Sequence, residues 1–446
     1  MAGEWEKVRL GDLVKITHGW PFKSECFTEE RTGRPIIVSI GNFQYTGGFR
    51  FETTTIKEYT ADYPKEYELT PGDILLVMTC QTSGGEILGI PGRIPDDGNI
   101  YLHNQRMGKV VIKERKRIDP GFIYYLSLWS DFNRELCVSA SGTKILHTAP
   151  VRIEAFEFNL PPLAEQKAIA AVLGALDDKI ELNRRMNATL EAMARALFQS
   201  WFVDFDPVRA KLDGRPPAAL DPATTALFPE HLEETALGHT PQGWEVRSLD
   251  KTAHYLNGLA LQKYPPGDGP TLPVIKIAQL RKGDSIGADR CNTDLPPNYI
   301  VQDGDVLFSW SGSLEVELWC GGPGALNQHL FKVTSPEFPK WFYYLWTLYH
   351  LDEFRLIAAD KATTMGHIQR GHLTAAKVLI PPRPLLDAMT RTMSPLIDQL
   401  IANRIQSRTL ATLRDTLLPK LLSGELSVAA TVAKSATVQT GKETRP

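Results

Sequence analysis

The 446-residue sequence lacks a long hydrophobic run and contains little cysteine. It has no stretch of about 18 apolar residues, so no membrane-spanning helix is expected. The first residues do not have the pattern of a signal peptide. The five cysteines are scattered, with no C-x-x-C pair, and predict neither a disulfide framework nor a zinc site. These absences predict a cytoplasmic protein whose cysteines are free and mostly buried.

The sequence also lacks an excess of positive charge. Its 49 lysines and arginines are outnumbered by 52 aspartates and glutamates, which gives a formal net charge of −3. A domain that binds nucleic acid by electrostatic attraction alone is usually strongly basic. If this chain binds DNA, local patches or a partner must therefore supply part of the attraction to phosphates.

The usual catalytic motifs are missing as well. The sequence has no G-x-x-x-x-G-K-[ST] phosphate loop, no H-E-x-x-H metal motif and no G-x-S-x-G nucleophile turn. Residues 159–162 (Asn-Leu-Pro-Pro) only approximate the Asn-Pro-Pro-aromatic motif of amino-methyltransferases, and no glycine-rich S-adenosylmethionine loop accompanies them. Asp96 and Glu114 fit a loose pattern found in Mg²⁺-dependent nucleases, but the pattern is short and common in surface loops. A nuclease is therefore a minor alternative.

What the sequence does contain is a repeat of two halves about 220 residues apart. Asn183 corresponds to Asn403, and His147 to His367. Each half begins with a tryptophan motif and continues with a Gly-Asp turn that leads into a β-branched run, a pattern typical of a buried strand. A period of this length exceeds that of solenoid repeats, so it predicts two whole modules. Short strands mixed with few helices predict the α+β class for each module.

Each module is followed by a long amphipathic helix. Pro161-Pro162 and Pro381-Pro382 suit a first helical turn. Apolar residues then continue at heptad spacing for five heptads in both copies, which predicts that both helices form a coiled coil. Asn183 and Asn403 occupy the same seam position, where a polar residue fixes register; otherwise they lie at a splayed point near solvent.

These signals divide the chain into six segments. We expect two globular domains, two long helices, a Pro- and Ala-rich linker and a disordered tail. The segments are a first domain over 1–160, a first helix over 161–206, the linker over 207–242, a second domain over 243–380, a second helix over 381–424 and the tail over 425–446.

Polar and amide side chains gather in the loops of both halves. Asn and Gln can pair with adenine edges and Arg with guanine, so these residue types suit the reading of DNA bases. Each one taken alone is more often an ordinary loop residue. The candidates for DNA binding in the first half are Asn42, Gln44, Thr79, Gln81, Asn104, Gln105, Arg106 and Lys144. Those in the second half are Lys276, Gln279, Arg281, Ser309, Ser311, Asn327, Gln328, Lys361 and Thr364.

Two further strings carry a family resemblance. Residues 160–169 read Leu-Pro-Pro-Leu-Ala-Glu-Gln-Lys-Ala-Ile, and residues 198–207 read Phe-Gln-Ser-Trp-Phe-Val-Asp-Phe-Asp-Pro. With the two-fold repeat of module plus helix, they resemble the specificity (S) subunit of type I restriction–modification systems. The resemblance covers nearly the whole chain. One departure is the second helix, where Leu385-Leu386 stands in place of the family's Glu-Gln.

The resemblance implies a DNA-recognition subunit without catalytic activity of its own. Each module would read half of a bipartite DNA target. The two coiled-coil helices would pack antiparallel as a spacer and bind two modification subunits. Those subunits would bring S-adenosylmethionine for adenine-N6 methylation, and separate restriction subunits would bring ATP and Mg²⁺. No cofactor or metal is expected in this chain. A scaffold that binds only proteins is the remaining alternative.

Overall fold

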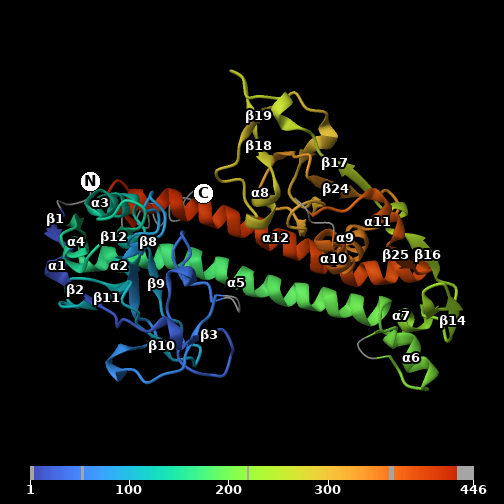
Figure 1. The fold of residues 1–446 in the computed structure, drawn as a ribbon, viewed down its shortest axis with the longest axis horizontal. Coiled ribbons are helices and arrows are strands. Elements are labelled where there is room, and N and C mark those ends of the chain that lie inside the picture. The colour runs from blue at the N-terminus through green and yellow to red at the C-terminus, as the bar shows by residue number, and fades with distance from the viewer. Residues whose placement is uncertain (1–4, 52–54, 218–219, 361–365, 429–446) are drawn as a thin grey trace, which may run out of the picture. The chain divides into compact units, whose positions relative to one another are not determined.

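The computed structural model describes residues 5–51, 55–217, 220–360 and 366–428. The chain divides into two compact units, one made of residues 1–178 and 411–446 and the other of residues 179–410. Two 40-residue helices, α5 (Leu163–Phe202) and α12 (Arg383–Leu422), each contribute residues to both units (Figure 1). Within the described residues, no helix is both long and apolar enough to cross a membrane.

Unit 1 contains two main sheets. The sheet with the longer strands, the larger sheet, is antiparallel and has the order β2 (Val14–His18), β11 (Met107–Ile112), β7 (Ile74–Val77) and β9 (Pro91–Arg93). The second sheet has the order β3 (Phe27–Thr28), β5 (Glu58–Tyr59), β4 (Ile36–Ile37), β10 (Tyr101–Leu102) and β6 (Glu68–Leu69). Strands β4 and β10 pair parallel, and the other pairs are antiparallel.

Unit 2 repeats this topology. Its larger sheet has the order β17 (His254–Asn257), β24 (Leu330–Thr334), β21 (Val306–Ser309) and β22 (Val316–Leu318). Its second sheet has the order β19 (Arg290–Asn292), β18 (Thr271–Ile275), β23 (Gly324–Leu326) and β20 (Ile300–Val301). The larger sheet again joins its strands in the sequence order first, fourth, second, third, and β18 again pairs parallel with β23.

The predicted Gly-Asp turns precede the central strands β7 and β21. Gly72 and Gly304 have φ angles of 87° and 86°, a region that residues with a side chain rarely adopt. The carboxylate of Asp73 pairs with Lys109 at 2.6 Å, and that of Asp305 pairs with Lys332 at 2.7 Å. Each turn is thus tied to the strand beside it, and all four residues of both central strands are buried.

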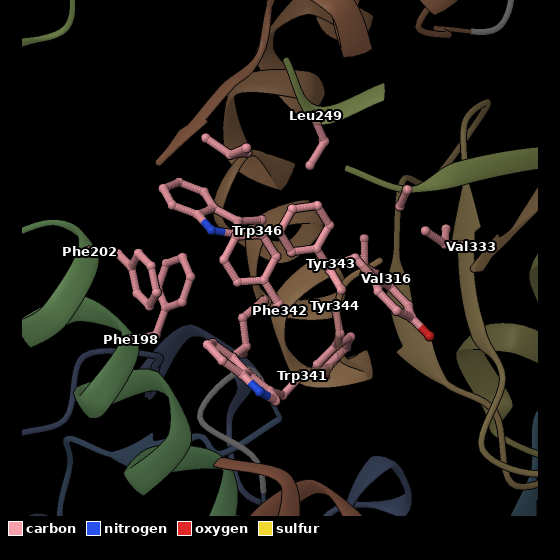
Figure 2. Close-up of a cluster of buried hydrophobic side chains, with 14 of the residues drawn as sticks. Phe198, Phe202, Leu249, Val316, Val333, Trp341, Phe342, Tyr343, Tyr344 and Trp346 are labelled. Carbon is pink, nitrogen blue, oxygen red and sulfur yellow. The ribbon is translucent and has the colours of Figure 1, made fainter. Parts of the chain in front are cut away.

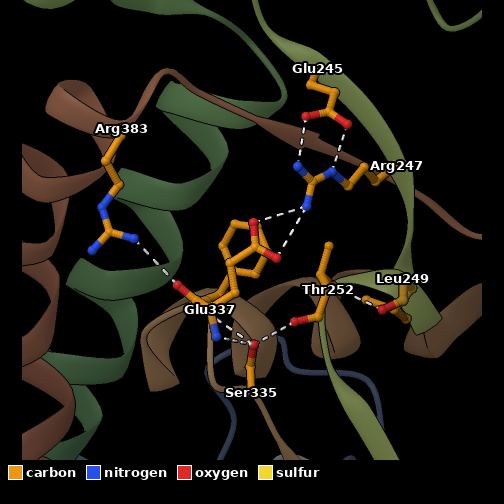
Figure 3. A network of polar contacts seen from close by, with 8 residues as sticks. Glu245, Arg247, Leu249, Thr252, Ser335, Glu337 and Arg383 are labelled. Carbon is orange, nitrogen blue, oxygen red and sulfur yellow. Dashed lines mark hydrogen bonds and ion pairs between the residues drawn. The ribbon is translucent and has the colours of Figure 1, made fainter.

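The first and last strands of each module pair with each other just before the long helix. These antiparallel pairs are β1 (Glu6–Arg9) with β13 (Glu157–Leu160), and β16 (Glu245–Ser248) with β25 (Lys377–Ile380). In unit 2, Arg247 of β16 bonds to the carboxylates of Glu245 and Glu337, and Arg383 donates to the Glu337 carbonyl (Figure 3). This network links β16 to the start of α12.

Shorter elements complete the modules. In unit 1 they are α1 (Leu10–Leu13), β8 (Thr79–Cys80), α2 (Pro120–Ser127), α3 (Ser130–Ser139), β12 (Leu146–His147) and α4 (Pro150–Glu154). In unit 2 they are α8 (Ile277–Lys282), α9 (Lys340–Tyr349), α10 (Leu351–Asp360) and α11 (Arg370–Ala375). The segment predicted as a linker contains α6 (Asp206–Leu212), α7 (Pro222–Leu227), β14 (Leu232–Thr235) and β15 (Gly238–Pro241).

The hydrophobic core of each unit includes residues of both long helices. In unit 2, Phe198 and Phe202 of α5 pack against Trp346 of α9, with ring centroids 5.0 and 5.6 Å apart (Figure 2). In unit 1, Leu421 and Leu422 of α12 are buried with residues of β1 and α2. The expected fold class, two α+β modules with long paired helices, is confirmed.

The predicted heptad seam is buried where the helices pair inside each unit. Ile169 and Leu173 are fully buried in unit 1, as are Met389 and Met393 in unit 2. Arg414 also lies in this seam and is nearly buried; its guanidinium pairs with the Asp177 carboxylate at 2.7 Å. The described part of the predicted tail ends at residue 428, and its remainder lies outside the described residues.

Candidate nucleic-acid interface

Three connecting segments meet in unit 1 and carry several of the predicted binding residues. The Met78 amide donates to the Arg106 carbonyl at 2.9 Å, and the Thr148 amide donates to the Met78 carbonyl at 2.9 Å. The Thr79 hydroxyl and the His147 Nδ1 are 3.1 Å apart. The segment after β7, the turn before β11 and the hairpin around β12 therefore form one cluster of loops.

Unit 2 contains an equivalent cluster. The Trp310 amide donates to the His329 carbonyl at 3.3 Å, and the Ile368 amide donates to the Trp310 carbonyl at 2.9 Å. Ser311 forms a β-bridge with His367, as Thr79 does with His147 in unit 1. The Ser311 hydroxyl lies 3.0 Å from the His329 Nδ1. Both units thus join the same three segments with the same backbone hydrogen bonds.

The exposed candidates of unit 1 project from this cluster. The side chains in this group are polar or cationic, and they make no hydrogen bond or ion pair with the residues that the structure describes. They are Gln81, Gln105, Arg106 and Lys144. In unit 2, Gln328 is half-buried and its Nε2 lies 3.3 Å from the His329 Nε2.

Five candidates are buried, and their polar atoms hold the loops in place. Asn42 accepts from the Ser39 amide at 2.8 Å and donates to the Thr55 carbonyl at 3.2 Å. Ser309 donates to the Ser313 carbonyl at 2.6 Å and accepts from the Glu315 amide at 2.7 Å. Thr79 contacts His147, and Ser311 and Asn327 both contact His329. The buried candidates are Asn42, Thr79, Ser309, Ser311 and Asn327.

Asn104 and Asn327 each cap a turn. The Asn104 Oδ1 accepts from the Arg106 amide and the Asn327 Oδ1 from the His329 amide, both at 3.2 Å. Gly19 packs against the turn at Asn104, and an added Cβ at Gly19 would lie 2.3 Å from the His103 carbonyl oxygen. These asparagines therefore shape the turn.

The remaining candidates lie elsewhere or outside the described residues. Gln44 is exposed and donates to the Phe49 carbonyl at 3.1 Å. Lys276 pairs with Asp289, Gln279 accepts from the Lys276 amide at 3.3 Å, and Arg281 is exposed on α8. Lys361 and Thr364 lie outside the described residues.

Sequence reasoning did not select three histidines of these clusters. His147 and His367 stand 220 positions apart, and this spacing was the signal that could have marked them. His329 had no such signal, because its equivalent in the first half is Arg106. Trp310, whose indole donates to the Asn257 Oδ1 at 2.9 Å, lies 5.9 Å from the His329 ring.

Burial also decides the charge of a histidine next to the first cluster. Burial lowers the pKa of His103 to about 4, although its hydrogen bond to the Met107 carbonyl acts in the opposite direction. His103 is therefore neutral near pH 7 and does not add a positive charge. The cationic side chains of this cluster are those of Arg106 and Lys144.

The predicted register residues lie against each other within unit 2. The Asn183 amide donates to the Gln406 Oε1 at 2.9 Å, and the Asn403 amide donates to the Asn187 Oδ1 at 2.9 Å. Asn183 and Asn403 are 0% and 3% exposed, so this cluster of amides is inside the helix pair. The Asn183 Oδ1 is buried and has no hydrogen-bond partner among the described residues. The cluster therefore carries a cost in stability.

The alternative nuclease site has no support in the local geometry. Glu114 is exposed and lies 3.9 Å from Arg117, and Asp96 is exposed in another loop. Within the described part of the chain, no group of three His, Cys, Asp or Glu side chains is placed to hold a metal ion.

Comparison with known proteins identifies the first module. The family model described as the type I restriction modification DNA specificity domain matches residues 2–192. Residues 2–192 are thus similar to a type I specificity domain. The topology of this domain recurs in unit 2, as described above.

Relatives extend the likeness to nearly the whole chain. The MjaIX specificity subunit of Methanocaldococcus jannaschii is 26% identical, over 95% of this chain and 98% of its own length. The HindI specificity subunit of Haemophilus influenzae is 24% identical, over 95% of this chain and all of its own. The fold is similar to that of an S subunit from M. genitalium, with a TM-score of 0.54, 14% identity and coverage of 94% and 96%. The predicted resemblance to type I specificity subunits is confirmed.

Proposed function

We propose that this chain is the DNA-recognition subunit of a type I restriction–modification complex and that each specificity domain reads one half of a bipartite target. The observation that carries this proposal is the duplicated loop cluster, in which both units join the same three segments with the same backbone hydrogen bonds. Two similar but non-identical loop clusters suit the reading of two different short sequences.

We further propose that the chain directs chemistry carried out by its partners. Modification subunits would bind S-adenosylmethionine and methylate adenine N6, and restriction subunits would supply ATP- and Mg²⁺-dependent cleavage. The complex would act in the cytoplasm. The sequence without a nucleotide loop or a metal motif supports this division of labour.

The exposed side chains of the clusters are the proposed DNA contacts. Arg106, Gln105 and Gln81 suit base edges, and Lys144 suits a phosphate. With a net charge of −3, the chain would depend on the modification subunits for much of the phosphate contact. The salt dependence of DNA binding should then be shallow for the chain alone and steep for the complex.

Exchange of the first module tests the proposal. Residues 1–160 are replaced by the corresponding module of another specificity subunit, and methylated adenines are mapped in cells that contain the modification subunits. One half-site should change and the other should remain. An unchanged target would favour the scaffold that binds only proteins.

The nuclease alternative has its own test. Purified full-length chain with Mg²⁺ should leave DNA uncut, and Asp96→Ala should not alter cleavage by the assembled complex. Loss of cleavage in that variant would assign a catalytic role to Asp96.

A further inference from the structure

The two Asn-capped turns carry side chains of different chemistry at one equivalent position. Each turn has the sequence Asn-Gln-X, where X is Arg106 in unit 1 and His329 in unit 2. The amide of X donates to the asparagine side chain at 3.2 Å in both turns. The amide of the next residue, Met107 or Leu330, donates to the asparagine carbonyl at 3.0 Å in both.

The surroundings hold both turns in the same backbone conformation. The carbonyl of X accepts from Met78 in unit 1 and from Trp310 in unit 2. Isolated parallel bridges join Asn104 to Trp20 and Asn327 to Leu259. The position X is thus presented by one framework, while its side chain is cationic and exposed in unit 1 and an imidazole, half-buried beside Trp310, in unit 2.

We propose that position X, Arg106 in unit 1 and His329 in unit 2, determines which base each half-site accepts at one position. This inference rests on the proposed function and deepens it. The Arg106 side chain makes no hydrogen bond or ion pair with any residue that the structure describes, so its guanidinium is available for a ligand. A guanidinium pairs with the O6 and N7 of guanine, and Arg106 therefore selects guanine.

His329 has a more restricted side chain. The Ser311 hydroxyl contacts its Nδ1 at 3.0 Å and Gln328 contacts its Nε2 at 3.3 Å. The imidazole is thus oriented within the protein and can form at most a single hydrogen bond to a base edge through Nε2. Unit 2 has no arginine at position X. The half-site that it reads therefore accepts a different base there.

Selection from a fully randomised double-stranded DNA library tests the inference. The full-length chain is assembled with its modification subunits, and the bound sequences are compared between variants. Arg106→Ala should lower the preference for guanine at one position of one half-site by about 10- to 100-fold and leave the other half-site unchanged. Arg106→Lys keeps the charge but loses the two-point contact, and it should relax the same position.

The matched control is Arg115→Ala. Arg115 is exposed and follows β11, whereas Arg106 precedes this strand, so the two arginines lie at opposite strand ends. The control should leave the selected motif unchanged. The reciprocal variant, His329→Arg, should add a preference for guanine to the second half-site.

Other outcomes would overturn the inference. If Arg106→Ala weakens binding to all sequences equally and lowers the salt slope by about one, Arg106 contacts a phosphate. An unchanged motif or a change in both half-sites would also reject the assignment. If the unaltered complex selects no bipartite motif at all, the proposed function itself fails, and this result differs from the others.

Discussion

At the scale of single residues, a buried carboxylate holds the loop that precedes β4. Glu58 is fully buried and accepts hydrogen bonds from the amides of Thr32, Gly33 and Arg34 at 2.8 to 3.2 Å, and Arg31 pairs with it at 3.1 Å. Burial by itself raises the pKa of Glu58, but the hydrogen bonds outweigh it and lower the pKa to about 2. The charged form is therefore favoured in the folded protein.

This carboxylate makes the stability of unit 1 depend on acid. Because the pKa of Glu58 is lower in the folded protein, its charged form stabilises unit 1 at pH values above 4.5. This contribution is lost as pH falls from 4.5 towards 2. Glu58→Gln should cost on the order of 3 kcal/mol at pH 7 and much less near pH 2. Urea unfolding at several pH values measures it. The exposed neighbour Glu30→Gln is the control and should have no effect; equal losses in both variants would contradict the argument.

Gln166 lies at a position where the two halves of the repeat differ. Gln166 is fully buried and accepts from the Asp119 amide at 2.9 Å, while its own amide donates to the carbonyls of Arg117 and Pro161, both at 2.8 Å. Its counterpart Leu386 is buried in the hydrophobic core of unit 2. Unit 2 thus has a buried apolar side chain where unit 1 has a buried side chain that makes hydrogen bonds.

Exchange of these side chains should therefore be unfavourable. Gln166→Leu removes the side-chain partner of three backbone groups, one of them buried and two part-buried, and should lower the free energy of unfolding of unit 1 by about 3 kcal/mol. Hydrogen exchange at the start of α2 and α5 measures the change. Lys167→Gln, on the exposed face of the same turn, should be neutral. A loss in that variant as large as in Gln166→Leu would point to a general defect of the helix.

At the scale of elements, α5 and α12 are continuous helices of 40 residues each, and each contributes to both units. The amide cluster of Asn183, Asn187 and Asn403 lies in the part of the helix pair that belongs to unit 2. A buried polar cluster of this kind favours one register over its neighbours. Its energetic cost is consistent with a role in alignment.

The helices are proposed to set the spacer between the half-sites. Insertion of one heptad after Asp178 in α5 and another after Leu410 in α12 preserves the heptad phase and adds about 10 Å of helix. The preferred spacer should lengthen by up to about three base pairs, with both half-sites intact. Methylation mapping reads the spacer directly. An unchanged spacer would contradict the proposal, and a four-residue insertion, which breaks the phase, should abolish activity.

At the scale of the whole molecule, the end of the described chain completes the unit that contains its beginning. Leu418, Leu421 and Leu422 are 7%, 1% and 3% exposed and belong to the core of unit 1. The Val428 amide donates to Glu165 at 2.8 Å. Unit 1 is therefore assembled from segments far apart in the sequence.

Truncation after Leu410 should unfold unit 1 and spare unit 2. Removal of three buried leucines costs about 2–5 kcal/mol for each, which exceeds or approaches the stability of a typical domain. Limited proteolysis should cut residues 5–160 rapidly in this variant and leave residues 243–360 protected. Truncation after Val428 keeps all the described contacts and should behave like the full chain. Equal protection of both modules in the shorter variant would contradict the packing argument.

The sequence by itself determined the duplication, the fold class, the two long helices and their polar seam positions. These features depend on local signals: Gly-Asp turns, Pro-Pro helix starts and heptad periodicity, each of which acts over a few residues. The family resemblance rested on equally local strings. Domain boundaries and the choice of DNA contacts stay predictions.

Only the tertiary structure decided which polar loop residues face outward. Asn42, Ser309 and Asn327 have the same residue types as good base readers, but their hydrogen bonds are satisfied within the protein. His329 is part of the second loop cluster because Ser311 and Trp310, which precede it by more than one turn of chain, lie beside its ring. Burial and long-range pairing depend on how the chain folds back on itself, and no local pattern in one sequence encodes them.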